Sequence, residues 1–138
     1  MSDITQLCLT ALKEKLDAGT LSSEKTVQAF FESYQLDAKS DTPLNGYIEF
    51  FDDALSQARE EDKKRKSGSH GILSGLPIAV KDKILITGKQ ATCGSKILEG
   101  FTAPYSATVI SRLQKEGAVF LGRTNMDEFA MGSSCEYS

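Results

Sequence analysis

Gly75-Leu76-Pro77-Ile78-Ala79-Val80-Lys81-Asp82 is a short apolar run followed directly by two charged side chains. Proline is tolerated at the start or edge of a strand, so the run from Leu76 to Val80 predicts a short buried strand. Lys81 would then lie where the strand ends, with its ammonium drawn into a desolvated part of the sheet. Desolvation disfavours the charged form, and a neutral lysine can act as a general base or as an amine nucleophile toward carbonyls. Taken alone, the segment favours the alternative, a structural lysine whose side chain reaches water.

The sequence after this strand predicts a helix and then another strand. The helix covers about 107–116, with Ser106 as its cap and with Ile110 and Leu113 on its inner face. The next strand covers 118–122, which is a continuous apolar run. Two strands joined through a helix pair in parallel, so this half of the chain predicts an α/β unit.

The sequence before the strand begins with two predicted helices. The first places apolar side chains at helical spacing over 4–16, with Asp3 as a candidate N-cap. The second begins at Ser22 or Ser23. Its apolar face is formed by Val27, Phe30, Phe31 and Tyr34.

A short strand and a third helix complete the front half. Residues 47–51 are aromatic and β-branched enough for a strand, and 52–64 predict a helix with acidic residues in its first turn and basic residues at its end. Within this helix we expect the i,i+4 ion pairs Glu60–Lys64 and Glu61–Arg65. A Ser/Gly-rich linker over 67–71 then separates the helical front from the α/β unit.

The composition is that of one globular domain. The chain has 138 residues, of which 40% are apolar and 25% charged, and its net charge is -3 with a pI near 5.2. This charge gives no long-range attraction to nucleic acid or to an anionic membrane, so it favours a small-molecule substrate.

Cysteine and histidine usage narrows the chemistry further. Cys8, Cys93 and Cys135 are odd in number and lack metal-type or redox-type spacing, which favours reduced thiols and a cytoplasmic location. No secretion signal or membrane-spanning apolar run is recognisable in the sequence. His70 is the only histidine, so a histidine-based catalytic triad cannot form within these residues.

Several motifs, in one order, resemble the amidase-signature family. The Pro-Ile-x-Val-Lys-Asp pattern at 77–82 is followed by Ala-Thr-Cys-Gly-Ser at 91–95, by Ala-Thr-Val at 107–109 and by Gly-Ala at 117–118. The most specific match is Gly-Arg-Thr-Asn-Met-Asp-Glu-Phe-Ala-Met-Gly-Ser-Ser at 122–134, in the form seen in the A subunits of Glu-tRNA(Gln)/Asp-tRNA(Asn) amidotransferases. The resemblance is strong from about Gly75 onward and looser over the two front helices.

The resemblance implies an α/β fold, in which N-terminal helices precede the first part of a mixed sheet flanked by helices. It also implies a Ser-cisSer-Lys triad in which Lys81 is the lysine. Both serines lie in glycine-rich motifs further along the family's sequence, so we expect this chain to be an N-terminal portion that stops before the nucleophile. We expect a single domain over 1–138, with 1–66 as a mainly helical front and 72–138 as the start of the catalytic α/β core.

Met131, Gly132 and Ser133 match the positions where the family lines its substrate pocket. A glycine there would let backbone approach a ligand closely. The alternative is that Gly132 only terminates a short helix begun near Asn125, and the two interpretations are compatible. The chain departs from the family's pattern at Lys83, Cys135 and Tyr137. On a strand, Lys83 would share a face with Lys81, whereas a turn would direct it to solvent.

The resemblance further implies the glutaminase subunit of a glutamine-dependent aminoacyl-tRNA amidotransferase, a carbon-nitrogen ligase. Such a subunit would pass ammonia to a B subunit that binds ATP, Mg²⁺ and the mischarged tRNA, with a small C subunit bridging the two. The chain itself would need no cofactor, would meet tRNA only through its partner and would not contact a membrane. Two alternatives are a stand-alone amidase and a non-catalytic docking or structural module.

Overall fold

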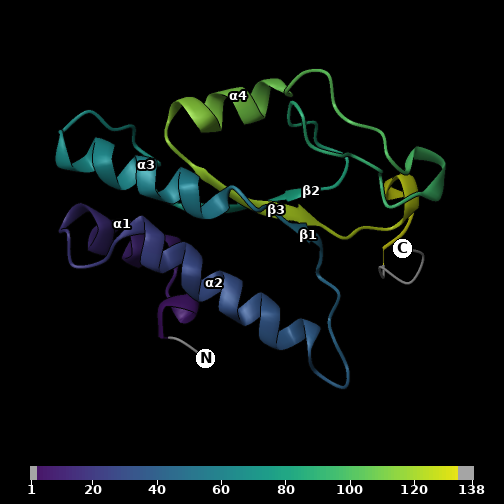
Figure 1. Ribbon diagram of the computed structural model, residues 1–138, viewed down its shortest axis with the longest axis horizontal. Helices are drawn as coiled ribbons and strands as arrows, with labels where there is room; N and C mark the ends of the chain where they lie inside the picture. The colour runs from purple at the N-terminus through teal and green to yellow at the C-terminus, as the bar shows by residue number, and fades with distance from the viewer. Residues whose placement is uncertain (1–2, 134–138) are drawn as a thin grey trace.

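The protein has an α/β fold in a computed structural model that describes residues 3–133 (Figure 1). This confirms the predicted fold class. The 3-10 helices are η1 (Asp3–Gln6), η2 (Lys96–Leu98) and η3 (Glu128–Ala130). The α-helices and strands, in chain order, are α1 (Leu9–Asp17), α2 (Ser23–Ala38), β1 (Tyr47–Phe50), α3 (Ala54–Lys66), β2 (Pro77–Lys81), α4 (Thr108–Lys115) and β3 (Val119–Thr124).

The described strands form one mixed sheet in the order β1-β3-β2. Strand β2 pairs in parallel with β3, as predicted, and Lys81 lies opposite Thr124. Strand β1 pairs antiparallel with β3 on its other side. Because β3 is the central strand, its residues from Val119 to Arg123 are buried on both faces.

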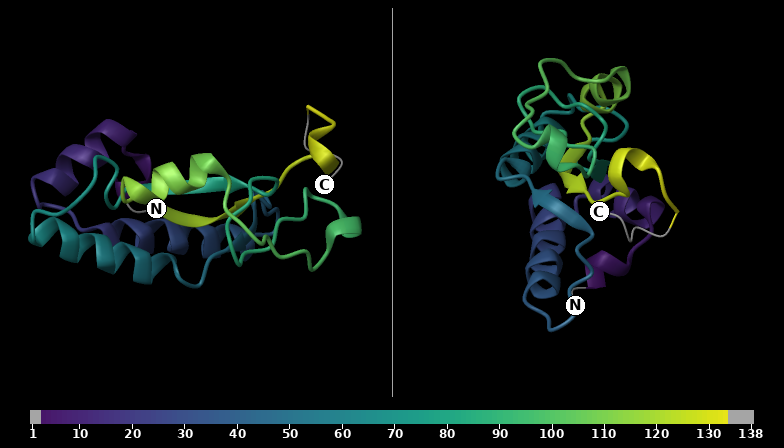
Figure 2. Two further views of the ribbon diagram at one scale, coloured as in Figure 1. Left: turned by 90° about the horizontal axis from the view of Figure 1, so that it is seen from above. Right: turned by 90° about the vertical axis from the view of Figure 1, so that its right-hand side faces the viewer.

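Helices from both halves of the chain cover this sheet. In Figure 1, α4 lies above the strands and α2 below them, and α3 packs along α2 and against β3. The two views in Figure 2 show the same layers from above and from one end. The main core draws on α2, α3, α4 and all three strands, and its buried members are Val27, Phe51, Ala54, Ala58, Val80, Ile110, Val119, Phe120 and Leu121.

Helix α2 follows its sequence pattern closely. Ser22 is its N-cap and accepts a hydrogen bond from the Lys25 amide at 3.2 Å, which confirms one of the two predicted caps. Val27 is fully buried, while Phe31 and Tyr34 join the β1 aromatics in a cluster with ring centroids 5.1–6.3 Å apart. No helix within residues 3–133 is long and apolar enough to cross a lipid bilayer.

The prediction of one continuous first helix with Asp3 as its N-cap is wrong. A 3-10 turn over Asp3–Gln6 comes first, and α1 begins only at Leu9, with Cys8 as N-cap. The break lets the turn pack independently. Ile4 and Leu7 contact a small cluster whose buried members are Leu12, Leu16 and Leu76.

The predicted local polar contacts also differ. Within α3 the ion pairs are i,i+3, joining Glu60 to Lys63 at 2.6 Å and Glu61 to Lys64 at 2.5 Å. The Arg65 side chain does not pair within α3. It extends to α1 and binds Asp17 there at 2.7 Å.

The predicted Ser106 cap of α4 is wrong, because the Ser106 side chain also has a partner outside the helix. Ala107 is the N-cap and makes no side-chain cap bond. The Ser106 hydroxyl accepts a hydrogen bond from the Thr87 amide at 3.0 Å and so closes the long loop that precedes the helix.

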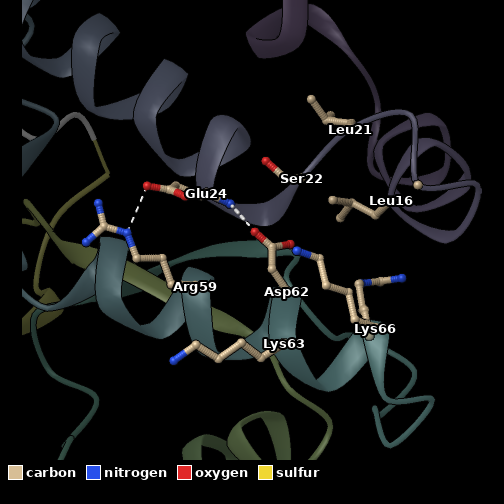
Figure 3. A pocket seen from close by; sticks show the side chains of 10 residues that line it. Leu16, Leu21, Ser22, Glu24, Arg59, Asp62, Lys63 and Lys66 are labelled. Carbon is tan, nitrogen blue, oxygen red and sulfur yellow. Dashed lines mark hydrogen bonds and ion pairs between the residues drawn. The ribbon is translucent and has the colours of Figure 1, made fainter.

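A hollow of about 490 Å³ lies between α1, the start of α2 and the end of α3 (Figure 3). Both arginines that line it are paired with acidic side chains: Arg59 binds Glu24 at 2.8 Å, and Arg65 binds Asp17. Asp62 accepts hydrogen bonds from the amides of Ser23 at 2.8 Å and of Glu24 at 3.1 Å. A carboxylate from α3 thus satisfies two amides in the first turn of α2.

We expect Asp62→Ala to loosen the first turn of α2. Losing a side-chain cap costs about 1 kcal/mol, which corresponds to about fivefold faster hydrogen exchange for amides that open locally. The measurement is exchange into deuterium of the peptide that covers Ser23 and Glu24. Lys63→Ala is the control, because the exposed Lys63–Glu60 pair contributes little. Equal exchange in both variants would contradict the capping role of Asp62.

Candidate active site

Lys81 is the last residue of β2 and lies at the carboxyl end of the parallel pair β2–β3. Ala79 and Lys81 are exposed whereas Val80 between them is buried, so Lys81 lies on the open face of the strand. The burial predicted for its side chain is therefore not supplied by residues 3–133. Within these residues its ammonium makes no hydrogen bond or ion pair. Carboxyl ends of strands in open α/β sheets are common ligand sites, and Lys81 occupies such a position.

The neighbouring Asp82 side chain is buried, with 1% of its surface exposed. Its carboxylate accepts hydrogen bonds from the Thr92 hydroxyl, from the Thr92 amide at 3.2 Å and from the Gly94 amide at 3.0 Å. Arg123 donates a further bond from its guanidinium at 2.6 Å. A buried charge needs such partners, and Asp82 finds them on two segments distant from it in sequence.

Arg123 links this carboxylate to the opposite edge of the sheet. Its side chain projects from β3 and lies between the carboxylates of Asp82 and Glu49. The guanidinium binds the Glu49 carboxylate of β1 at 2.7 Å. Arg123 is only 8% exposed, and Glu49 is much more accessible. One buried cation thus joins the ends of all three described strands.

The pKa values of this pair follow from its surroundings. Burial alone would raise the pKa of Asp82, but the hydrogen bonds from Thr92, Gly94 and Arg123 outweigh it and hold that pKa below its usual value. Burial likewise works against a charged Arg123, yet its bonds to Glu49 and Asp82 raise its pKa. Both groups are therefore charged at neutral pH.

The segment that binds Asp82 has an unusual backbone. Cys93 and Gly94 both adopt left-handed conformations, with φ of 54° and 64°. A Cβ on Gly94 would lie 2.7 Å from the Met126 carbonyl oxygen, so only glycine fits this approach. Cys93 carries a free thiol, as does Cys8.

This segment also holds the stretch that follows β3. The Phe129 amide donates to the Cys93 carbonyl at 2.9 Å, and the Ser95 hydroxyl donates to the Glu128 carboxylate. Phe129 and Ala130 are left-handed as well, with φ of 52° and 60°. Such conformations in non-glycine residues are rare and concentrate at functional sites.

Met131, Gly132 and Ser133 follow directly and are exposed, Met131 to 81%. Instead of a regular helix begun near Asn125, the chain forms only the distorted 3-10 turn η3. Gly132 follows the C-cap Met131 of this turn but lacks the left-handed backbone of a helix-terminating glycine, so the prediction that it terminates a helix begun near Asn125 is wrong. Its hydrogens face Asp127 instead: a Cβ there would lie 2.5 Å from the Asp127 carboxyl carbon.

Among the described residues, no hydrogen bond or ion pair joins Lys81 to Met131, Gly132 or Ser133. Lys81 ends β2, and Met131–Ser133 follow the end of β3. None of these four residues lines the hollow of about 320 Å³ beside the Asp82 network, which is lined by Ile48, Gln90, Thr92, Gly94, Ser95, Lys96, Glu99, Arg123 and Asn125.

The three departures from the family pattern have different outcomes. Lys83 lies in a turn closed by a hydrogen bond from the Ile84 amide to the Lys81 carbonyl at 2.9 Å, and its side chain is exposed. This confirms the alternative in which Lys83 points to solvent. Cys135 and Tyr137 lie outside the described residues.

Sequence reasoning missed the residues that organise this site. Arg123, Thr92 and Glu49 received no role, and Asp82 was noted only as part of a motif. Arg123 could have indicated this network from the sequence alone. A cation that continues a buried apolar strand needs a carboxylate partner. The sequence did not identify that partner, because 41 residues separate it from Arg123.

Known proteins resemble the chain over most of its length. The Amidase family profile matches residues 26–138. The A subunit of the glutamyl-tRNA(Gln) amidotransferase from Treponema denticola is 50% identical over 98% of this chain, and that from Prosthecochloris aestuarii is 52% identical over 92%. The chain spans 28% and 26% of the lengths of these two relatives.

Solved amidase structures share the fold. The peptide amidase of Stenotrophomonas maltophilia is 35% identical with a TM-score of 0.80, over 86% of this chain and 24% of that one. A fatty acid amide hydrolase is 32% identical with a TM-score of 0.82, over 93% of this chain and 22% of that one. With a family match over most of its length and a shared fold, the chain belongs to the amidase family.

Proposed function

We propose that this chain contributes the catalytic lysine and part of the substrate pocket to the glutaminase subunit of a glutamine-dependent aminoacyl-tRNA amidotransferase. The observation that carries the proposal is the identity of about half of all residues, over 98% of the chain, with the A subunit of a glutamyl-tRNA(Gln) amidotransferase. The likeness to other amidases of known structure is lower, at 24–35% identity.

In this proposal Lys81 is the general base. A neutral Lys81 amine accepts a proton from a bridging serine, and that serine accepts one from the nucleophilic serine. The nucleophile then attacks the side-chain amide carbon of glutamine, and ammonia leaves after protonation. Both serines, and the backbone amides that stabilise the oxyanion, belong to parts of the protein outside these 138 residues.

Met131, Gly132 and Ser133 are the proposed pocket segment. Their exposure leaves backbone and side-chain groups available to a ligand, and the left-handed residues before them fix the direction of the chain. Gly132 supports this assignment, because any side chain at that position would collide with Asp127 and shift the segment.

The remaining parts of the reaction fall to partners. We infer that ATP, Mg²⁺ and tRNA are bound by a B subunit, that a small C subunit bridges this B subunit and the glutaminase, and that the assembly is cytoplasmic. The net charge of -3 is in keeping with a protein that handles glutamine and leaves tRNA to its partner.

A stand-alone amidase is the second candidate, supported by the 35% identity and TM-score of 0.80 with the peptide amidase. Parallel assays of the complete protein on glutamine and on peptide amides separate the two. Hydrolysis of the peptide amides without hydrolysis of glutamine would overturn the amidotransferase assignment. A stop codon directly after Ser138 in the reading frame would favour a non-catalytic module.

Lys81→Ala and Lys81→Arg should both abolish glutamine hydrolysis by the complete protein. Alanine removes the base, and a guanidinium stays protonated and cannot accept a proton. General-base catalysis contributes about 10²- to 10⁴-fold, so ammonia release should fall by at least that factor. Lys83→Ala, two residues away in the exposed turn, is the control and should stay within about twofold of wild type. Near-normal turnover by either Lys81 variant would remove Lys81 from the mechanism.

Residues 1–138 expressed alone should release no ammonia from glutamine above the buffer rate. A lysine without the two serines cannot form an acyl-enzyme, and each missing oxyanion donor costs about 2.7–4 kcal/mol. The assay compares the purified chain with its Lys81→Ala variant. Turnover that disappears in the variant would mean that a complete catalytic arrangement exists within these residues, and the proposal would have to be abandoned.

A further inference from the structure

Asp82 is held more firmly than the end of a strand requires. Its carboxylate receives hydrogen bonds from Thr92, Gly94 and Arg123, and its main chain is fixed as well. The Asp82 amide donates to the Thr124 carbonyl at 3.2 Å, and its own carbonyl accepts from the Cys93 amide at 3.2 Å. Side chain and backbone are thus tied both to β3 and to the 92–94 segment.

Lys81 is the peptide-bonded neighbour of this residue and shares its constraint. Its carbonyl accepts a hydrogen bond from the Ile84 amide, and its Cα lies opposite Thr124 in the sheet. The Lys81 ammonium is exposed, so only the backbone fixes where the side chain begins. Whatever displaces Asp82 therefore displaces the origin of the Lys81 side chain.

The same 92–95 segment holds the stretch that leads to Met131–Ser133. The Cys93 carbonyl binds the Phe129 amide, Ser95 binds Glu128, and Gly94 packs against Met126. A continuous path of hydrogen bonds and packing contacts therefore runs from Asp82 through Thr92–Ser95 to the residues directly before Met131. It connects two chain segments that no strand pairing joins.

We propose that Asp82, held by Thr92 and Gly94, is a positioning residue that keeps Lys81 in register with the Met131–Ser133 segment. The inference rests on the proposed function, in which these two elements are the base and part of the pocket. The competing explanation is that the Asp82 network only stabilises the fold. The two differ in what a small, local change should do to kcat.

Thr92 gives the sharpest test, because replacing Asp82 would take from the buried Arg123 its one buried partner and threaten folding. Thr92→Val keeps the shape but removes the hydroxyl that donates to the Asp82 carboxylate, and Thr92→Ser keeps the hydroxyl. Thr87→Val is the matched control. It removes a hydroxyl from the same long loop, where the exposed Thr87 contacts Ser106 and does not bind Asp82.

The experiment measures kcat and KM for glutamine in the complete protein, together with deuterium exchange of the peptide that covers Phe129. Misplacing a catalytic group by about 1 Å costs about 10²-fold. We expect Thr92→Val to lower kcat by about 10- to 100-fold with KM within about threefold, and to speed exchange at Phe129. Thr92→Ser should restore both to near wild type, and Thr87→Val should change neither.

Three results would overturn the inference: a Thr92→Val variant with unchanged kcat, a Thr92→Ser variant as impaired as Thr92→Val, or exchange at Phe129 that is insensitive to Thr92. Failure of the proposed function looks different. Wild type and Lys81→Ala would then be equally inactive on glutamine, while the exchange measurement would still decide whether Asp82 and Thr92 hold the segment before Met131.

Discussion

The buried ion pair between Asp82 and Arg123 is the constraint on which the rest of this structure depends. Removing two charges from water costs several kcal/mol per ion, and only close pairing with additional hydrogen bonds offsets that cost. Two kinds of contact supply this pairing. Thr92 and Gly94, in the loop after β2, donate hydrogen bonds to the Asp82 carboxylate. Glu49 of β1 accepts a hydrogen bond from the Arg123 guanidinium. The loop after β2 therefore has to fold over the strand ends.

The helical front and the α/β unit share one sheet and one core. Strand β1 comes from the front half, yet it pairs with β3 and supplies Glu49 to the buried cation. The helices of the front half take part in the same core, since Val27 of α2 and Ala58 of α3 pack with Val80 and Val119. Removing the front would deprive Arg123 of its Glu49 partner and leave one edge of β3 unpaired.

Periodic apolar patterns predicted most of this fold, and long-range polar contacts explain what the sequence did not reveal. Helix α2, the third strand and the parallel pairing follow from local spacing and were confirmed. The Ser106 cap and the Glu61–Arg65 pair were wrong because partners elsewhere competed: Thr87 for Ser106, and Asp17 for Arg65. The Glu60–Lys64 pair was wrong because Glu60 and Lys64 each found a partner three residues away within α3. The sequence marked Lys81 through its motif. It did not reveal the Asp82 network, whose partners lie 10–41 residues away.

Lys81 is exposed, and a lysine that acts as a base must satisfy two separate requirements. It must stand in the right place, and it must be desolvated enough to lose its proton. Residues 3–133 fix where the Lys81 side chain begins through the contacts of Asp82, and those contacts do not depend on what covers the side chain. They do not cover that side chain, since Lys81 lies on the open face of β2. If Lys81 is the base, the covering side chains must come from outside these residues. The position of the base and its activation are then set by different parts of the protein.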